Sequence, residues 1–367
     1  MKKRRIVIAS VLKPVNDTRM YEKLATTLAD AGHEVWVLGY PAAHPVSHPG
    51  IRSWSLPPFS RLSLQRVLAR WKILQKTIEV KPELLMVTTH ELLIVGILNR
   101  IFFGSRLVYD VQENYYRNIL WTRAFPRFLR LPLALWVRLK EKLAAPFIHG
   151  FLLAEEGYQT ELYFTRKRHL VVANKCVVPA GFQRTPATGR TILLFTGTLA
   201  ESTGVFQAIE LTRQLHAADP SVELRLIGYC AVEKEWQQIV RAISGAPFMS
   251  VTGGRTLVPH AQIMEAIGTA HAGIVYYPPS PHIQNRIPTK LYEYLACRLP
   301  VLLQPVPAWL ALAEPVHGAI PIDFNKTDAH AVVNQLKQNS FFPHPSNQFT
   351  WQSEAPKLTS FIEKLLK

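Results

Sequence analysis

The sequence contains little cysteine and no long apolar run. Three cysteines occur among 367 residues, Cys176, Cys230 and Cys297, and they lack the paired spacing of a zinc site. So few thiols exclude a disulfide framework and indicate a reducing compartment, the cytoplasm. No uncharged apolar stretch approaches the roughly 18 residues that a membrane-spanning helix needs. Hydrophobic residues still make up 48% of the chain, enough to fill the cores of two domains of ordinary size.

Negative charge is also scarce. There are 42 Lys and Arg residues against 26 Asp and Glu, which gives a formal net charge of +16. Such an excess attracts polyanions: nucleic acid, anionic lipid head groups or phosphorylated substrates. No helix-turn-helix, RNP-like or zinc-finger pattern accompanies the charge, so we do not expect nucleic acid as a partner.

The basic excess is dense between residues 117 and 142, "RNILWTRAFPRFLRLPLALWVRLKEK". Arg and Lys alternate there with Trp, Phe and Leu, the composition of a helix that lies in the plane of an anionic bilayer surface. The alternative is a set of helices that pack on their own sheet and expose a solvated basic face. We expect Pro126 and Pro132 to interrupt any single long helix. The first interpretation predicts a peripheral protein on the inner face of the cell membrane.

Short apolar runs alternate with helical patterns along the chain. This alternation predicts an α/β protein with two doubly wound, Rossmann-like domains whose parallel sheets are covered on both faces. A linker rich in Pro, Gly and Thr near residues 174–190 separates a domain over 1–175 from a domain over 190–345. The expected strands are Ile6–Ala9, Val35–Leu38, Leu84–Val87, Leu107–Tyr109, Phe151–Leu153, Leu170–Ala173, Ile192–Phe195, Leu224–Ile227, Phe248–Val251, Gly273–Tyr276, Pro300–Leu303 and Ala319–Ile322.

Polar segments that contain glycine follow several of these strands. Examples are "TGTLAESTG" after Phe195 and "TGGRT" after Val251. Open α/β sheets bind ligands at the carboxyl ends of their strands. Two such domains that face each other would place a ligand in a central cleft. We therefore expect the functional residues in these segments.

The stretch "NRIPTKLYEYLACRLPVLL", residues 285–303, places a lysine and a glutamate in the first two turns of an apolar helix. Pro288 suits a helix start, where the backbone amides and the helix dipole form an anion site. Lys290 adds a full positive charge, and Glu293 could accept hydrogen bonds from the two hydroxyls of a ribose. Together they suggest a nucleoside diphosphate site. The alternative is an ordinary i,i+3 ion pair on a wet surface.

Several motifs resemble those of bacterial GT-B glycosyltransferases, especially retaining enzymes of glycosyltransferase family 4. "IPTKLYEYLACRLPVLL" resembles their P-x-K-x-x-E-Y stretch, and "GTLAESTGVFQAIEL" is similar to the opening loop of their second domain. "NDTRMYEKLATTLADAGHEVWVLGY" and "GSRLVYDVQENYY" are similar to first-domain motifs of members that build bacterial surface polysaccharides. The resemblance implies a GT-B fold, a UDP- or GDP-sugar donor in the second domain, a glycan or lipid-linked acceptor in the first, and a C-terminal helix over 351–367 that crosses back.

The resemblance also implies roles for individual residues on the donor side. Glu293 matches the ribose-binding glutamate, and Lys290 matches a lysine near the diphosphate. The departures are Thr198 and Thr203, where many members have basic residues, and Asn285, where many have a glutamate. The diphosphate would then be met by amides, hydroxyls and nearby cations. The donor-binding candidates are Gly197, Thr198, Thr203, Gly204, Gly253, Gly254, Arg255, Asn285, Arg286, Lys290 and Glu293.

The candidates in the first domain lie after its strands. His90 could orient a hydroxyl and Glu113 could act as a general base, so with Lys290 they form the expected catalytic set. Asp17, Arg19 and Gln112 are the acceptor-binding candidates, although Asp17 and Arg19 could equally serve to cap a helix. No acidic D-x-D pair stands in the donor loop. We therefore expect no metal and no cofactor beyond the donor substrate.

Two other functional classes fit the same pattern. One is a nucleotide-sugar epimerase on the same fold, which would need carboxylates acting on the sugar; Asn285 counts against it. The other is a protein that binds a sugar nucleotide without catalysis, as a sensor or as a partner in a biosynthetic complex. Transfer and hydrolysis assays with UDP- and GDP-sugars would separate these classes.

Overall fold

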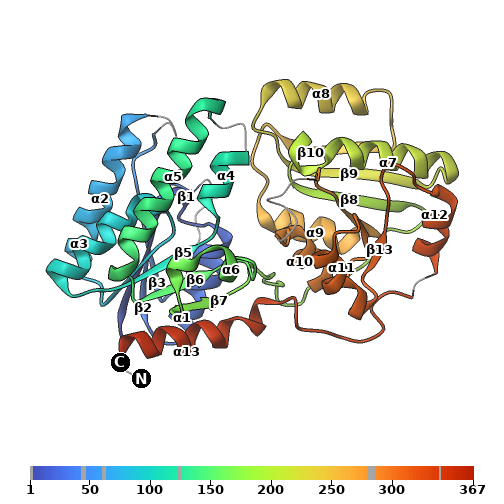
Figure 1. Cartoon of the computed structure of the whole chain (residues 1–367). Helices are drawn as coiled ribbons and strands as arrows, with labels where there is room; N and C mark the ends of the chain where they lie inside the picture. Colours follow the sequence, from blue (N-terminus) through green and yellow to red (C-terminus); the bar gives the residue numbers. More distant parts are fainter. Residues whose placement is uncertain (1–2, 43–46, 60–62, 122–124, 280–285, 339) are drawn as a thin grey trace. The chain divides into compact units, whose positions relative to one another are not determined.

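The computed structural model describes residues 3–42, 47–59, 63–121, 125–279, 286–338 and 340–367. The chain divides into two compact units, each built on one parallel sheet (Figure 1). Unit 1 comprises Met1–Asn174 and Trp351–Lys367, and unit 2 comprises Lys175–Thr350. The α/β architecture expected from the alternating pattern is confirmed. The three cysteines are buried, and none of them forms a disulfide with another described residue.

Unit 1 contains a seven-stranded sheet in the order β3-β2-β1-β4-β5-β6-β7. Six of these strands were predicted, and β3 was not. β3 is an edge strand of sequence IRSWS, and its three polar residues leave no apolar run that marks it. The strands are β1 (Arg5–Pro14), β2 (Glu34–Tyr40), β3 (Ile51–Ser55), β4 (Leu84–Val87), β5 (Arg106–Val111), β6 (Gly150–Leu153) and β7 (His169–Val171).

The helices of unit 1 cover both faces of its sheet. Helices α2, α3 and α5 lie on one face and α1 on the other, where the C-terminal helix α13 packs beside it (Figure 1). Trp351 Nε1 donates to Thr27 Oγ1 at 2.7 Å next to α13. The helices are η1 (Thr18–Ala25), α1 (Thr26–Asp30), α2 (Leu64–Val80), η2 (His90–Leu92), α3 (Leu93–Phe103), α4 (Tyr115–Trp121), α5 (Arg127–Ala144), η3 (Ala145–Phe147), α6 (Tyr158–Glu161), η4 (Tyr163–Thr165), η7 (Trp351–Ser353) and α13 (Ala355–Leu366).

Unit 2 contains a six-stranded parallel sheet in the order β10-β9-β8-β11-β12-β13. All six strands were predicted. They are β8 (Thr191–Thr198), β9 (Val222–Tyr229), β10 (Met249–Gly254), β11 (Ala272–Val275), β12 (Val301–Leu303) and β13 (Ala319–Pro321). The helices are η5 (Glu201–Thr203), α7 (Val205–Ala218), α8 (Glu233–Ile243), α9 (His260–Thr269), α10 (Thr289–Ala296), α11 (Pro307–Ala313), η6 (Glu314–Val316) and α12 (Ala329–Lys337).

The two prolines of the basic segment behave differently. Pro126 directly precedes α5, so this helix begins at the proline and does not extend across it, as expected. Pro132 lies inside α5, so the expectation that it also interrupts the helix was wrong. Pro132 is in the second turn at an exposed position, where the helix loses one hydrogen bond and the ring meets no buried neighbour. The result is one amphipathic helix over Arg127–Ala144.

Candidate functional site

Three glycines line up across the carboxyl ends of adjacent strands in unit 2. Gly197 of β8 pairs with Gly228 of β9, which pairs with Gly253 of β10. A Cβ on Gly228 would collide with the carbonyl oxygen of Gly197, and one on Gly253 would collide with that of Gly228. The neighbouring strand therefore requires glycine at Gly228 and Gly253, while an added Cβ on Gly197 would meet no atom within 4 Å. The end of β8 at Gly197 thus presents bare backbone with room for a ligand to approach. Gly197 and Gly253 were predicted from the sequence, whereas Gly228 was missed; its signal was a glycine at the end of an apolar run.

The loop between β8 and α7 is held by its own hydroxyl group. Thr203 Oγ1 lies 2.6 Å from the carbonyl oxygen of Thr198 and 2.9 Å from that of Ala200. Gly204 follows with φ +82°, and a Cβ there would lie 2.6 Å from the carbonyl oxygen of Tyr276. The Thr203 hydroxyl thus holds the turn, while Thr198 is exposed at the strand end. A donor-binding role for the two threonines stays a prediction.

Helix α10 is fastened to the sheet by Tyr294. Its hydroxyl lies 3.1 Å from the Thr196 amide nitrogen and 2.9 Å from Thr196 Oγ1. Gly273 of β11 leaves space for the ring, because a Cβ at that position would overlap Tyr294. Lys290 lies four residues earlier on the same face of the helix. The anchor therefore directs Lys290 toward the end of β8.

Lys290 is a buried cation. Its side chain is 7% exposed, and Nζ has no hydrogen-bond partner among the described residues. Nζ lies 3.7 Å from the centroid of the Phe195 ring and 5.5 Å from that of Tyr277. Burial lowers the pKa of Lys290 to about 7, although Glu293 opposes the shift. A buried amine without a hydrogen-bond acceptor is unfavourable unless a ligand supplies one.

Glu293 lies one turn after Lys290 and has a partner that sequence reasoning missed. Its Oε1 is 3.2 Å from Nε2 of His260, the first residue of α9, and its side chain is 14% exposed. Arg255 is held by the carbonyl oxygen of Cys230 at 2.6 Å and by Glu233 at 3.2 Å. These contacts hold Glu293 against α9 and hold Arg255 just after the end of β10.

Three further donor-side candidates are placed differently. A Cβ on Gly254 would overlap the Trp236 ring, so this glycine makes room for packing. The carbonyl oxygen of Arg286 accepts a hydrogen bond from Trp309 Nε1 at 2.6 Å, which holds the chain just before α10. Asn285 lies outside the described residues. No contact assigns Arg286 or Asn285 to a ligand, and their roles stay predictions.

In unit 1, two predicted acceptor residues meet on one buried carboxylate. Arg19 binds Asp110 through Nε at 3.0 Å and Nη2 at 2.7 Å, and Gln112 Nε2 donates to Asp110 Oδ2 at 2.9 Å. Burial alone would lower the pKa of Arg19, but the charge and hydrogen bonds of Asp110 outweigh it and raise that pKa. Asp17 caps η1 by accepting from the amides of Arg19 and Met20. These residues order the carboxyl edge of the sheet, and acceptor contact stays a prediction.

The ion pair of Arg19 and Asp110 predicts a large loss of stability when it is broken. Asp110→Ala should destabilise unit 1 by roughly 3–5 kcal/mol, because it leaves a buried guanidinium without its counter-charge. The control is Glu79→Ala, which removes an exposed partner of Lys76 and should cost less than about 1 kcal/mol. Urea denaturation of both variants measures the difference. Equal costs for the two substitutions would show that the buried pair is not a structural anchor.

His90 and Glu113, the other catalytic candidates, have separate partners. His90 Nδ1 lies 3.1 Å from Lys140 Nζ, and Glu113 Oε2 accepts from Asn118 Nδ2 at 2.7 Å. Burial, then the charges of Lys140 and Arg66, lower the pKa of His90 to about 3. The ring is therefore neutral near pH 7 and suits hydrogen bonding better than proton abstraction. The described parts of the chain hold no group of three His, Cys, Asp or Glu side chains fit for a metal, and metal independence stays a prediction.

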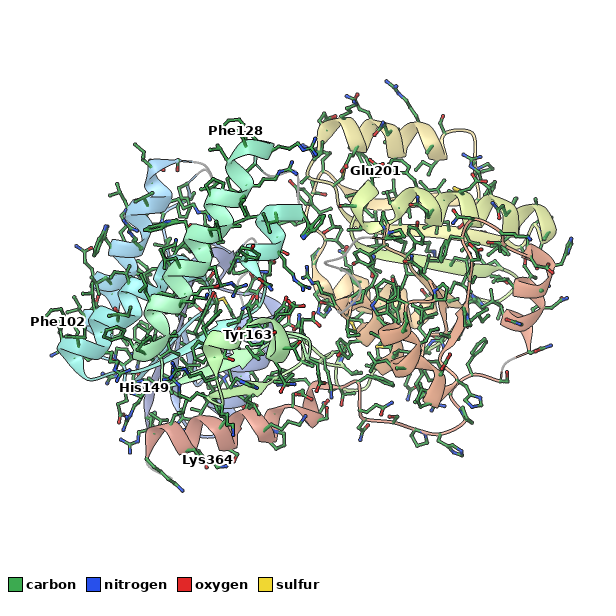
Figure 2. The ribbon with its side chains drawn as sticks, viewed as in Figure 1. Phe102, Phe128, His149, Tyr163, Glu201 and Lys364 are labelled. Atoms are coloured by element: carbon green, nitrogen blue, oxygen red, sulfur yellow. The ribbon has the colours of Figure 1, made fainter. Side chains whose placement is uncertain are left out.

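Unit 1 also carries an exposed apolar face on α2, α3 and α5. In Figure 2, Phe102 of α3 and Phe128 of α5 both point away from the unit, and they are 70% and 78% exposed. Described residues of unit 2 expose few comparable side chains. No helix in the described ranges is both long and apolar enough to cross a membrane. The exposed apolar residues on the three helices are Leu64, Val67, Leu68, Trp71, Ile78, Ile94, Ile101, Phe102, Phe103, Phe128, Leu129, Leu131, Leu135, Trp136, Leu139 and Leu143.

Comparison with known proteins shows which solved structures share this fold. No family model matches the sequence, and no curated protein matches it. Anabaena HepE, solved with UDP and glucose, has a TM-score of 0.70 at 15% identity over 98% of this chain and 100% of its own. WaaG, a glycosyltransferase involved in lipopolysaccharide biosynthesis, has a TM-score of 0.64 at 13% identity over 98% of both chains. A Listeria monocytogenes protein described as a UDP-N-acetylglucosamine 2-epimerase has a TM-score of 0.64 at 12% identity over 99% of this chain and 96% of its own.

These likenesses, with the two parallel sheets, define a GT-B fold. At this level of identity they show the fold and no more.

Proposed function

We propose that this protein is a retaining, metal-independent glycosyltransferase. It transfers a sugar from a UDP- or GDP-sugar to a hydroxyl of a lipid-linked saccharide in cell-surface polysaccharide biosynthesis. The observation that carries the proposal is Lys290, a buried amine with no described hydrogen-bond acceptor, at the start of α10. Its Nζ lies over the ring of Phe195 in β8, a strand that ends at the exposed Thr198, and Lys290 stands one turn before Glu293. Support for the substrate class comes from HepE, which binds UDP and UDP-glucose on the same fold.

The chemistry follows from the charge of the leaving group. A nucleoside diphosphate gains negative charge as the bond to the sugar breaks, so the protein must stabilise that charge more strongly in the transition state. Lys290 supplies a full charge and the amides at the start of α10 supply the helix dipole. Glu293, steadied by His260, would accept the ribose hydroxyls. These groups need no metal to act.

The surface of unit 1 supports the proposed acceptor class. Its exposed apolar face combines Leu, Trp and Phe with exposed cations such as Arg127 and Lys142. This combination matches an anionic bilayer, which attracts the cations and takes up the apolar side chains. The protein would then bind the inner face of the membrane and receive an acceptor carried by a lipid.

The test of the proposal is donor binding followed by transfer. A thermal-shift panel of UDP-, GDP-, ADP- and CMP-sugars should show stabilisation by a UDP or GDP compound. Glu293→Ala should remove most of the shift, because the ribose loses its acceptor. Glu265→Ala, which alters a carboxylate in α9 outside the site, should leave it unchanged. Stabilisation by none of these nucleotides would refute the donor site.

The alternative on the same fold is a nucleotide-sugar epimerase, which the likeness to the Listeria protein favours. Product analysis separates the two. A transferase releases UDP or GDP when a lipid-linked acceptor is added, whereas an epimerase changes the sugar without any acceptor. A binding protein without catalysis would give the thermal shift and neither product. Detection of the epimerised sugar without acceptor would replace the transferase assignment.

A further inference from the structure

Around the predicted catalytic residue His90, unit 1 gathers basic side chains that the donor site in unit 2 does not use. We define the basic cluster as Arg66 and Arg70 of α2, His90 of η2 and Lys140 of α5. Lys140 Nζ lies 3.1 Å from His90 Nδ1, and Arg66 Nη2 lies 2.8 Å from Glu91 Oε1. Because η2 begins three residues after β4 ends, the basic cluster lies at the carboxyl edge of the sheet.

The charges in the basic cluster do not balance. Three of its members are permanent or strong cations, and among the described residues Glu91 forms an ion pair with Arg66. Glu141 is held by Arg138 and Tyr109, each at 3.1 Å. Burial, and then the charges of Arg70 and Arg66, lower the pKa of Lys140 against the attraction of the two glutamates. A bound anion would relieve this excess of positive charge.

Two buried donors also point to an anionic ligand. Arg70 Nε and Thr89 Oγ1 are both buried and have no hydrogen-bond partner within the described parts of the chain. Thr89 is 3% exposed and directly precedes η2, beside His90. Buried donors without partners are unfavourable, and most such groups in proteins are satisfied. Phosphate oxygens accept hydrogen bonds from both groups and pair well with guanidinium and ammonium.

The surroundings of the basic cluster are apolar and exposed. Val67 and Trp71 of α2 are 46% and 42% exposed, Ile94 of α3 is 42% exposed, and Trp136 of α5 is 57% exposed. The three helices lie side by side in unit 1, with α3 packed between the other two (Figure 1). A ligand that joins a phosphate to an apolar chain would satisfy both the cations and these side chains.

We propose that the basic cluster binds the phosphate group through which an acceptor sugar is joined to its apolar chain. The apolar chain then lies along the exposed faces of α2, α3 and α5. This inference rests on the proposed function, because it names the acceptor class of that transferase. It assigns Arg66, Arg70 and Lys140 to phosphate recognition, with His90 as a neutral residue that positions Lys140.

The test measures binding of farnesyl diphosphate to the full chain by calorimetry, with the donor site filled by saturating UDP. A second series uses Lys290→Met without UDP, which lowers the affinity of the donor site for the diphosphate of the probe. We expect farnesyl diphosphate to bind at least about tenfold more tightly than farnesol or inorganic pyrophosphate. Arg70→Ala and Lys140→Ala should each weaken it by about tenfold or more.

Controls separate folding, specificity and the donor site. Arg106→Ala removes an exposed cation at the amino end of β5, opposite the carboxyl ends of the strands where the basic cluster lies, and should leave the affinity unchanged. Circular dichroism checks the fold, and Arg70→Gln is a milder second variant. Wild-type affinity in the Arg70 and Lys140 variants would overturn the inference, while UDP binding would still stand. Equal binding of dihexanoylphosphatidylglycerol, with the same dependence on Arg70, would assign the basic cluster to bulk lipid and overturn the acceptor role.

Discussion

Lys290→Met is expected to weaken UDP binding and to stabilise the ligand-free protein at the same time. Losing a charge-assisted contact to the diphosphate should cost roughly 10- to 100-fold in affinity. The same change replaces a buried amine without a described acceptor by an apolar chain of similar length. Removing the unfavourable burial should raise the free energy of unfolding by about 1–3 kcal/mol. The loss of the cation–π contact with Phe195 offsets part of this gain. Calorimetry and urea denaturation measure the two effects.

Lys290 should also make the free energy of unfolding depend on pH. Its pKa in the folded chain is about 7, below its ordinary value of 10.5. Between these pH values the unfolded chain binds more protons than the folded one, so stability rises with pH across that window. Lys290→Met should lose this rise. UDP binding near pH 8 should take up a proton, because the diphosphate favours the charged lysine; calorimetry in buffers of different ionisation enthalpy detects it.

The matched control is Lys326→Met, at an exposed position in unit 2. It should change neither UDP affinity nor stability by more than about 0.5 kcal/mol. If Lys290→Met binds UDP as tightly as the wild type, the lysine does not contact the diphosphate. If it is also less stable than the wild type, Lys290 is held by contacts that offset its burial, and both parts of the argument are wrong.

Binding to anionic vesicles is expected to depend on the apolar face of unit 1. Replacing Phe128, Leu135 and Trp136 of α5 by serine removes three exposed apolar side chains. Each should contribute about 1 kcal/mol or more to membrane insertion, so binding to vesicles containing phosphatidylglycerol should fall by roughly 100-fold or more. Added salt should weaken wild-type binding, because it screens the attraction of Arg127 and Lys142 for the lipid. Co-sedimentation measures both effects.

Unit 2 provides the control for this experiment. Val232, Val240 and Leu257 are also exposed, and replacing them by serine should leave vesicle binding unchanged. Since all six positions are exposed, neither triple variant is expected to lose its fold. Unchanged binding of the α5 variant would exclude α5 as the docking surface. Equal wild-type binding to neutral vesicles would exclude the electrostatic part of the interaction.

The strands could be predicted because each is a short apolar run of a buried parallel sheet, where both faces exclude water. Twelve runs marked twelve of the strands, and the edge strand β3 was missed because Arg52, Ser53 and Ser55 leave no apolar run in it. Lys290 and Glu293 could be selected because Pro288 marks a helix start and both follow within two turns. Partners far apart in the sequence were beyond reach: His260 beside Glu293, and Asp110 beside Arg19.

The alternation of apolar runs and helices was enough to establish two parallel α/β sheets, since periodicity and burial are local properties of the chain. The alternation could not establish the order of the strands, because strand pairing depends on contacts between distant segments. The strand order places β11 beside β8 and therefore brings α10, which follows β11, next to the end of β8. The packing of α10 then buries Lys290 over Phe195 and removes water from its amine. This loss of solvent, which no residue type or spacing encodes, turns an ordinary lysine into a candidate binding group.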